Sequence, residues 1–438
     1  MRSMNTKQKF LGKIADRELK IGIIGLGYVG LPLAVAFAEA GFPVFGIDVN
    51  ETKIDLLARG ESYVQDVPGS KVKGIVDSGM FTPSSDYANI AYSDAVLICV
   101  PTPLSKTRDP DISYIVDAVS RLAQYDLVGK LIVLESTTYP GTTEEIILSQ
   151  LSENGYRVGE DFFLSFSPER VDPGRMDYNL YTTPKVLGGV TKSCTEVAAA
   201  LYSIIVKDVV TVSSTAAAEM VKLLENTFRA VNIGLVNEVA IMCDKLGLDV
   251  WEIIEAASTK PYGFMPFYPG PGLGGHCIPI DPQYLSWKLR GLNYKARFIE
   301  LADQVNSFMP DYIVEKIVNG LNQRRKPVKD SKILVLGVTY KPDVNDVRES
   351  PALDIIQLLI NRGAVVRFHD PYVNEIAVSN QVFHTVDLNE DVLGETDCIV
   401  IVADHASYDW QWIARHADLI VDTRNALKNI ETGNVIKL

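Results

Sequence analysis

Residues 20–30 read "KIGIIGLGYVG" and join a short apolar run to three closely spaced glycines. The apolar run predicts a buried β-strand, and the following "LPLAVAFAEAG" predicts a helix. Gly25, Gly27 and Gly30 form a G-x-G-x-x-G pattern, which allows a tight turn and a close approach of the backbone to a pyrophosphate. The pyrophosphate would rest on the N-terminus of the helix. The stretch therefore predicts a strand–turn–helix unit that binds a dinucleotide.

The next strand candidate, "PVFGID", ends at Asp48, eighteen residues beyond Gly30. A carboxylate at this position accepts hydrogen bonds from the ribose hydroxyls of adenosine and repels a 2′-phosphate, so NAD is favoured over NADP. A glycine-rich turn without a ligand is the alternative. The strand before the motif, the helix after it and the distance to the acid favour the dinucleotide site.

The rest of the chain alternates in the same manner, except in its middle. Strand candidates "AVLICV", "LIVLES", "FFLSFS" and "KVLGG" precede a helical stretch at about 214–325, and "KILVLGV", "VVRFHDP", "CIVIVAD" and "LIVDTRN" follow it. This alternation is typical of βαβ units and parallel sheets. We therefore predict an α/β protein with two Rossmann-like, doubly wound parallel-sheet domains joined by a central helical region. The expected boundaries are 1–213, 214–325 and 326–438.

Composition limits the classes of function. The 438 residues are 47% hydrophobic and 22% charged, as expected of a soluble globular protein. The net charge of −13 disfavours nucleic-acid and anionic-membrane partners. No stretch resembles a signal peptide or a membrane span, and five widely spaced cysteines without a C-x-x-C pair indicate free thiols in a reducing cytoplasm and no structural metal.

One cysteine stands apart from the others. Cys277 lies in "GPGLGGHCIPIDP", residues 270–282, where glycines and prolines predict a loop and a reachable thiol. His276 precedes it and Asp281 follows it. Cys99 and Cys398, in contrast, fall in apolar runs that predict buried strands.

Further polar residues follow strands or share a helix face. Thr137 and Glu169 come after "LIVLES" and "FFLSFS", and ligands of open parallel sheets bind beyond the carboxyl ends of the strands. Lys222 and Asn226 are four residues apart on a predicted helix and share one face. Taken alone, a helix cap, a solvated loop acid and an ordinary polar stripe explain these residues better.

A thiol beside a nicotinamide extends the chemistry of an alcohol dehydrogenase. A thiolate can add to an aldehyde and give a thiohemiacetal, which can lose a second hydride and become a thioester. Water then releases a carboxylic acid. The scheme needs a thiolate, stabilisation of an oxyanion and a base for water.

Together, "GLGYVG", "ESTTYPGTT", "SPER", Lys222 with Asn226, "GGHCIPIDP" and "KPDVNDVRESP" resemble the UDP-glucose/GDP-mannose dehydrogenase superfamily over nearly the whole chain and in the same order. "GGHCIPIDPQYLSWK" and "NTFRAVNIGLVNE" are most similar to the branch that oxidises UDP-N-acetylhexosamines. The resemblance implies a four-electron oxidation of a C6 hydroxymethyl group to a carboxylate with two NAD⁺. UDP-N-acetylglucosamine is the first expected substrate, and a homodimer and a UDP-binding third domain are implied.

The resemblance also implies roles for single residues. Cys277 matches the nucleophile, Lys222 and Asp281 the pair that handles protons and the oxyanion, Asn226 their amide partner, and Thr137 and Glu169 the groups that hold water. The residues implied in binding NAD are Gly25, Gly27, Tyr28, Val29, Gly30, Asp48, Lys53, Thr102, Thr137 and Arg348. The residues implied in binding the sugar nucleotide are Glu169, Arg170, Lys222, Asn226, the loop Phe267–Gly270 with Tyr268, Gly274 and Lys341.

Three positions depart from the glucose branch of the family. Ile280 stands where that branch has a lysine, His276 where it has a small residue, and Pro173 where it has a second glutamate. His276 either favours the thiolate of Cys277 or packs for shape. The same chemistry on UDP-N-acetylgalactosamine, UDP-N-acetylmannosamine or UDP-glucose stays open, and so does a non-catalytic protein that binds a nucleotide sugar.

Overall fold

The glycine-rich stretch forms the strand–turn–helix unit that the sequence predicts. In the computed structural model, which describes residues 5–105, 109–171, 178–275 and 277–438, strand β1 (Ile21–Ile24) leads through this turn into helix α2 (Gly30–Glu39). Pro173 and His276 lie outside the described residues. The chain forms two compact units. The N-terminal unit comprises Met1–Glu225 and Gln283–Asn293, and the C-terminal unit comprises Asn226–Pro282 and Tyr294–Leu438.

The N-terminal unit is built on an eight-stranded sheet in the order β3-β2-β1-β4-β5-β6-β7-β8. Neighbouring strands are parallel except for the pair β6 and β7, which is antiparallel. The order reverses direction at β1, and such a switch point is where open α/β sheets bind ligands. The strands after β1 are β2 (Val44–Ile47), β3 (Phe81–Ser84), β4 (Ala95–Ile98), β5 (Leu131–Leu134), β6 (Phe163–Phe166), β7 (Lys185–Gly189) and β8 (Val209–Thr211).

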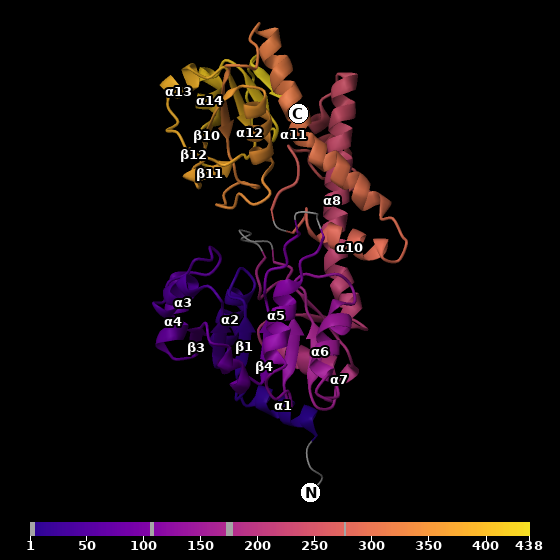
Figure 1. Cartoon of the computed structure of the whole chain (residues 1–438). Coiled ribbons are helices and arrows are strands. Elements are labelled where there is room, and N and C mark those ends of the chain that lie inside the picture. The colour runs from indigo at the N-terminus through magenta and orange to yellow at the C-terminus, as the bar shows by residue number, and fades with distance from the viewer. Residues whose placement is uncertain (1–4, 106–108, 172–177, 276) are drawn as a thin grey trace. The chain divides into compact units, whose positions relative to one another are not determined.

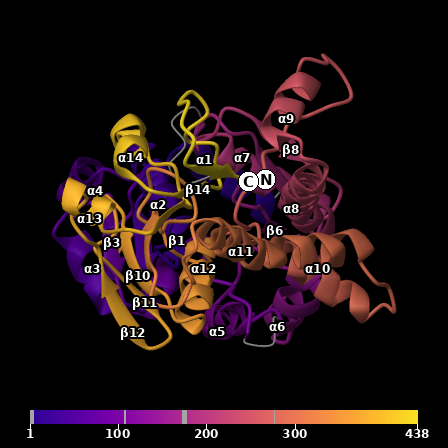
Figure 2. The same ribbon diagram turned by 90° about the horizontal axis from the view of Figure 1, so that it is seen from above.

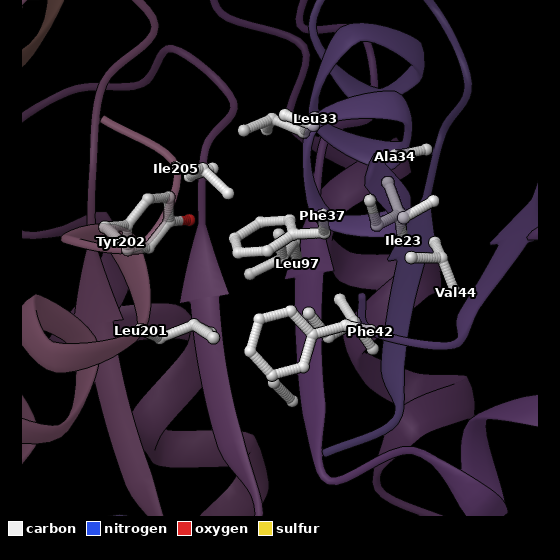
Figure 3. Close-up of a cluster of buried hydrophobic side chains, with 14 of the residues drawn as sticks. Ile23, Leu33, Ala34, Phe37, Phe42, Val44, Leu97, Leu201, Tyr202 and Ile205 are labelled. Carbon is white, nitrogen blue, oxygen red and sulfur yellow. The ribbon is translucent and has the colours of Figure 1, made fainter. Parts of the chain in front are cut away.

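Helices cover both faces of this sheet. One face packs against α1, α2 and α7, and the other against α5 and the segment around α6. On the first face, the ring of Phe37 meets those of Phe42 and Tyr202 edge-on, with centroids 6.2 and 6.0 Å apart (Figure 3). Burial on both faces explains why the strands are continuous apolar runs instead of alternating patterns.

The helical segments of this unit are α1 (Thr6–Ala15), α2, α3 (Glu51–Ala58), α4 (Gly69–Asp77), a 3₁₀ turn at Tyr87–Tyr92, α5 (Ser113–Leu122), a π-helical turn at Thr143–Leu148, α6 (Ser149–Ser152) and α7 (Lys192–Tyr202). Two further helices, α8 (Thr215–Leu246) and α10 (Asp281–Arg290), belong partly to each unit.

The C-terminal unit contains a five-stranded parallel sheet in the order β10-β9-β13-β14-β15 and a separate hairpin of β11 and β12. Figures 1 and 2 both show α12 lying along α11, on which apolar residues of α8 also pack. The strands are β9 (Lys332–Leu336), β10 (Val365–His369), β11 (Glu375–Val378), β12 (Gln381–His384), β13 (Cys398–Ile401), β14 (Ile420–Asp422) and β15 (Val435–Lys437). The remaining helices are α9 (Val250–Ser258), α11 (Arg297–Gln323), α12 (Pro351–Asn361), α13 (Glu390–Gly394) and α14 (Trp410–His416).

The predicted α/β class with two Rossmann-like sheets and a helical middle is confirmed. The domain boundaries at 213 and 325 stay a prediction. The sequence did not indicate β3, β8, β15 or the hairpin, because none of these strands is a continuously buried apolar run, and β3 carries Pro83 at the sheet edge. Among the described helices, even α8 and α11 lack the apolar length that a bilayer span requires.

Candidate active site

The glycine turn has the geometry of a dinucleotide cradle. Gly25 has a φ of +91°, and a β-carbon there would lie 2.5 Å from the carbonyl oxygen of Cys99. A β-carbon at Gly30 would overlap the carbonyl oxygen of Gly25. At Gly27, however, an added β-carbon meets no atom within 4 Å. The fold itself therefore requires Gly25 and Gly30, whereas the space at Gly27 fits a pyrophosphate against the backbone.

Asp48 supports this turn from the end of β2. Its Oδ2 accepts from the backbone N–H of Leu26 at 3.0 Å, and its Oδ1 accepts from that of Asn50 at 2.9 Å. The Nζ of Lys53 lies 3.4 Å from Oδ2. Each carboxylate oxygen has more than one lone pair, so these bonds leave acceptor capacity for a ribose hydroxyl.

The other residues expected to bind NAD fall in two places. Tyr28 is exposed, Val29 precedes α2, and the carbonyl of Thr102 accepts from the Tyr284 hydroxyl at 3.0 Å, all in the N-terminal unit. Arg348 lies in the C-terminal unit, where its guanidinium donates to both carboxylate oxygens of Asp346. All ten assignments, and NAD contacts of single residues in general, stay predictions.

The turn that follows β6 orients Glu169. Its Oε1 accepts from the backbone N–H groups of Arg170 and Val171 at 2.9 and 2.8 Å, and its Oε2 lies 3.3 Å from the Nζ of Lys185. Burial alone would raise the pKa of Glu169, but Lys185 and these N–H donors lower it below its usual range. Glu169 is therefore held as a carboxylate, the state that a base for water requires.

Helix α8 is joined to this turn by two bonds from neighbouring turns of the helix. The Nζ of Lys222 donates to the carbonyl oxygen of Glu169 at 2.7 Å. Arg170 binds Glu225 of α8 through Nη2 at 2.6 Å and the carbonyl oxygen of Pro184 through Nη1 at 2.6 Å. Three residues expected to bind the substrate, Lys222, Glu169 and Arg170, thus lie close together. The guanidinium of Arg170 is bound to Glu225 and Pro184 of the same unit.

Sequence patterns missed a buried group next to Glu169. Glu135, which follows β5, is 1% exposed and binds the Nζ of Lys185 at 2.6 Å and the hydroxyl of Tyr202. Burial raises the pKa of Glu135 to about 7, against the lowering effect of Lys185. Burial alone would lower the pKa of Lys185, but Glu135 and Glu169 raise it. In the sequence, Glu135 follows one apolar run and Lys185 precedes another, so no local signal marks them as a pair.

Thr137 lies half-buried in the loop after β5. The neighbouring hydroxyl of Ser136 donates to the carbonyl oxygen of Val100 at 2.7 Å. Further along, Glu219 of α8 accepts from the N–H of Gly141 at 2.6 Å and from the N–H of Thr143 at 2.9 Å. These bonds fix both ends of the "TTYPGTT" loop, so the backbone around Thr137 is held by packing within the N-terminal unit.

All five cysteines lie in the described part of the chain, and only Cys277 is exposed. Burial raises the pKa of Cys99 well above its ordinary value, and the same cause raises that of Cys398. Cys277 begins the turn into α10, because its carbonyl oxygen accepts from the N–H of Asp281 at 2.8 Å. Its setting is that of an accessible thiol. No group of three or more His, Cys, Asp or Glu side chains among the described residues could hold a metal ion.

Two predicted catalytic groups meet directly in the C-terminal unit. The side-chain amide of Asn226 donates to Oδ2 of Asp281 at 2.5 Å, and Asp281 is 2% exposed. Asp281 also stands at the first position of α10, where the helix N-terminus stabilises a negative charge. The amide therefore orients the carboxylate on the same short segment that carries Cys277.

The Cys277 loop is anchored on both sides within its unit. The N–H of Gly270 donates to Oδ1 of the buried Asn237 at 2.9 Å. The N–H of Gly275 donates to the carbonyl oxygen of Arg348 at 3.0 Å, and a β-carbon at Gly274 would lie 2.6 Å from Cβ of Tyr340. The glycines thus permit close packing on the segment at residues 340–351.

Aromatic contacts hold the start of this loop. The ring of Phe267 meets that of Phe228 edge-on with centroids 5.7 Å apart, and Tyr268 stacks on Trp251 at 6.1 Å. Lys341, the last residue expected to bind the sugar nucleotide, has its Nζ 5.6 Å from the centre of the Tyr340 ring. Thus Phe267, Tyr268, Gly270, Gly274 and Lys341 all lie in the C-terminal unit, while Glu169, Arg170 and Lys222 lie in the N-terminal unit.

A sheet switch point with a glycine turn, an acid beyond the second strand and an accessible thiol on an anchored loop define a class of dinucleotide-dependent oxidoreductase. Three family models match the chain: the NAD binding domain of the UDP-glucose/GDP-mannose dehydrogenase family at residues 19–206, its central domain at 216–308 and its UDP binding domain at 334–429. The chain belongs to this family and is an NAD-dependent nucleotide-sugar dehydrogenase.

Its relatives include a UDP-N-acetyl-D-mannosamine dehydrogenase of Pyrococcus horikoshii, which is 35% identical over 96% of this chain and 98% of the relative. A UDP-N-acetyl-D-glucosamine 6-dehydrogenase of Pseudomonas aeruginosa is 32% identical over 90% of this chain and 92% of the relative. Among solved structures, the UDP-D-ManNAc dehydrogenase of Pyrococcus horikoshii superposes with a TM-score of 0.87 at 34% identity and covers 96% of this chain and 99% of that one. The NDP-N-acetyl-D-galactosaminuronic acid dehydrogenase of Methanosarcina mazei has a TM-score of 0.81 at 31% identity, with 100% and 98% covered.

Proposed function

We propose that this enzyme oxidises the C6 hydroxymethyl group of a UDP-N-acetylhexosamine to a carboxylate, with Cys277 carrying the aldehyde between two oxidations. The exposure of Cys277 among four buried cysteines is the observation that carries this proposal. The N-acetylated sugar is supported by relatives that are named for such substrates. NAD⁺ accepts the hydride lost from C6 in each oxidation.

Cys277 and its neighbours supply the covalent part of the chemistry. The thiolate adds to the carbonyl carbon of the C6 aldehyde, and loss of the second hydride from the resulting thiohemiacetal leaves a thioester on Sγ. Water attacks the thioester carbon, the C–S bond breaks, and the uronate leaves as the thiolate returns. In total, one alcohol, two NAD⁺ and one water give one carboxylate, two NADH and three protons.

The remaining groups act on protons and developing charge. Lys222 and Asp281 handle the proton of the hydroxyl and stabilise the oxyanion, and Asn226 orients Asp281 through its amide. Glu169 and Thr137 hold the hydrolytic water, for which the ionised Glu169 is suited. These roles are proposals that follow from the family resemblance and from the contacts of each side chain.

The candidate substrates differ in the C2 and C4 configurations of the sugar. UDP-N-acetylglucosamine is our first expectation, and a relative from Pseudomonas aeruginosa carries that name. UDP-N-acetylmannosamine is the second candidate, because relatives from Pyrococcus horikoshii and Escherichia coli are named for it. Both sugars would meet the same thiol chemistry, so they are compared directly in the test below.

We also propose that the enzyme is a homodimer formed through α8 and α11. Phe228, Leu235 and Met242 are exposed and recur every seven residues along α8, and Phe298 and Phe308 are exposed on α11. Apolar side chains at a seven-residue spacing form a continuous seam that favours packing against another helix. A second copy offers the same seam in return.

The test counts NADH formed per sugar consumed. Purified enzyme and NAD⁺ are incubated separately with UDP-N-acetylglucosamine, UDP-N-acetylmannosamine, UDP-N-acetylgalactosamine and UDP-glucose. We expect two NADH per sugar with an N-acetylated substrate and loss of uronate formation in Cys277→Ala, with Cys243→Ala as the buried-thiol control. One NADH with accumulated aldehyde, or full activity in Cys277→Ala, would contradict the thiol mechanism. Sugar binding without NADH across the panel would instead indicate a binding protein.

A further inference from the structure

A buried ammonium group lies between two carboxylates at the edge of the N-terminal sheet. The Nζ of Lys185 is 2.6 Å from Oε2 of Glu135 and 3.3 Å from Oε2 of Glu169. The side chains of Lys185 and Glu135 are 4% and 0% exposed, whereas that of Glu169 is 15% exposed. Glu169 is thus the member of the three that solvent or a ligand reaches.

The reversed direction of β7 places Lys185 at this edge. Strands β5 and β6 are parallel, so Glu135 and Glu169, which follow them, come to the same end of the sheet. Strand β7 is antiparallel to β6, with Ser165 opposite Gly189. Its first residue, Lys185, therefore comes to the end at which β5 and β6 stop. A parallel β7 would have put the lysine at the opposite edge.

Other charged and titratable groups of the neighbouring elements surround Lys185, Glu135 and Glu169. Tyr202 of α7 donates to Glu135, and its ring lies 5.7 Å from the Nζ of Lys185. Burial is the main cause of the raised pKa of Cys99, which follows β4, and the charge of Glu135 raises this pKa further whereas that of Lys185 lowers it. Lys222 of α8 binds the carbonyl oxygen of Glu169 and lowers the pKa of its carboxyl group. Arg170 contributes its backbone N–H to the same carboxylate.

We propose that Lys185 and Glu135 are positioning residues, which hold the Glu169 carboxylate ionised and oriented for the hydrolytic half of the reaction. This inference rests on the proposed function, in which Glu169 serves the attack of water on the thioester. Lys185 shares one positive charge between two acids. When Glu135 is neutral, the whole charge acts on Glu169, and when Glu135 is ionised, Glu169 receives less of it.

Two variants test the positioning of Glu169. Glu135→Gln keeps an acceptor for Lys185 and is neutral at every pH. Because burial raises the pKa of Glu135 to about 7 while that of Glu169 is lowered, Glu135 is already neutral where Glu169 titrates, so the acidic limb of the kcat profile should stay at the wild-type position. Lys185→Met removes the cation, so the limb moves to higher pH, and kcat falls by about tenfold or more with little change in KM. Lys185→Arg restores part of kcat because it keeps the charge.

Lys130→Met provides the matched control. Lys130 is also buried in this unit, but it precedes β5 and donates to the carbonyl oxygens of Ile90, Ala91 and Ser93 at the other end of the sheet. Lys130→Met should destabilise the protein without shifting the pH profile of kcat. If Lys185→Met leaves the acidic limb at the wild-type position, or moves it only as Lys130→Met does, the proposal is wrong.

The step affected is identified in a rapid-mixing experiment. With slowed hydrolysis, Lys185→Met should form two NADH per active site in a burst and then turn over slowly, because the thioester accumulates. A variant that instead loses the burst would contradict a role confined to hydrolysis.

A readout without substrate separates this proposal from the proposed function. Infrared titration of protein labelled with ¹³C-glutamate, with Glu169→Gln to assign the band, follows the ionisation of Glu169 in the resting enzyme. The proposal requires the midpoint to rise in Lys185→Met and to stay in place in Glu135→Gln, whether or not any sugar is turned over. An unchanged midpoint in Lys185→Met would overturn it even if the wild type oxidises a UDP-N-acetylhexosamine.

Discussion

The backbone N–H of Val338 donates to Oδ2 of Asp370 at 2.7 Å. Val338 lies just beyond the end of β9, and Asp370 directly follows β10. The N-terminal unit contains the same arrangement, in which the N–H of Leu26 donates to Oδ2 of Asp48 at 3.0 Å. In each unit the donor follows a glycine with positive φ, and the acceptor follows the neighbouring parallel strand. Both sheets therefore use an aspartate to hold open the turn at their switch points, where ligands of such sheets bind.

Substitution of Asp48 tests the cofactor site. Asp48→Asn retains an acceptor for the N–H of Leu26 but loses the charge that repels a 2′-phosphate. We expect the KM for NAD⁺ to rise about tenfold or more and the use of NADP⁺ to improve, since a hydrogen bond to a charged group contributes roughly 1.5–3 kcal/mol. Steady-state kinetics with both cofactors provide the measurement. Unchanged cofactor preference would mean that the ribose does not meet Asp48.

The ionised Asp370 should make a pH-dependent contribution to the free energy of unfolding. Burial alone would raise the pKa of Asp370, but hydrogen bonds from His405 and from the N–H groups of Val338 and Tyr372 lower it. A lowered pKa in the folded state contributes stability above the unfolded pKa of about 4, and this contribution is lost as pH falls through the folded value. Asp370→Asn should therefore cost about 1–3 kcal/mol at pH 7 and progressively less below about pH 4.

Urea unfolding across a pH series measures this effect. The exposed Asp387 lies in the same unit, and Asp387→Asn serves as the control, with little change expected at any pH. A deficit in Asp370→Asn that stays constant down to acid pH would show that the charge of Asp370 is not the stabilising feature.

The packing of the Cys277 loop predicts a large effect of one methyl group. Gly275 has a φ of +83°, and a β-carbon there would lie 2.9 Å from Cε2 of Tyr340. Gly275→Ala should cost about 1–3 kcal/mol and reduce kcat, because backbone strain and overlap both displace the segment that carries Cys277. Gly74 in α4 is the control, since an added β-carbon meets no atom within 4 Å. Gly74→Ala should stabilise the helix by up to about 1 kcal/mol.

Thermal unfolding and kinetics of the two glycine variants separate stability from placement of the thiol. If Gly275→Ala retains wild-type kcat and melting temperature, the loop is not constrained by the Tyr340 segment in solution.

The apolar seam on α8 predicts the assembly state. Leu235 is 56% exposed between Phe228 and Met242, and Leu235→Asp would place a charge at the centre of the seam. We expect light scattering to show that the proposed homodimer dissociates into monomers, because burying an unpaired charge is costly. Val382 of β12 is similarly exposed, at 61%, and Val382→Asp should leave the dimer intact. A wild-type protein that is monomeric, or a Leu235→Asp variant that still dimerises, would contradict the interface.

The sequence predicted the elements whose signals are local. The strand, turn and helix around Gly25 are specified by a few adjacent residues, because only glycine avoids the carbonyl oxygen of Cys99 at that φ. The exposed position of Cys277 was also predicted, since glycine and proline exclude regular structure around it. Continuous apolar runs sufficed to identify most buried strands, whereas the polar β3 carried no such signal.

The tertiary structure alone decided which side chains meet. Lys185 stands in a strand that was predicted correctly, yet nothing in "KVLGG" shows that this strand runs against β6. Strand direction depends on the connection and on hydrogen bonds to a distant partner, and the described parts of the segment between β6 and β7 contain no crossover helix. That direction brings Lys185 to Glu135 and Glu169, which lie 50 and 16 positions away in the sequence. Residue type is a local property, but a buried charge finds its partners only when the sheet is assembled.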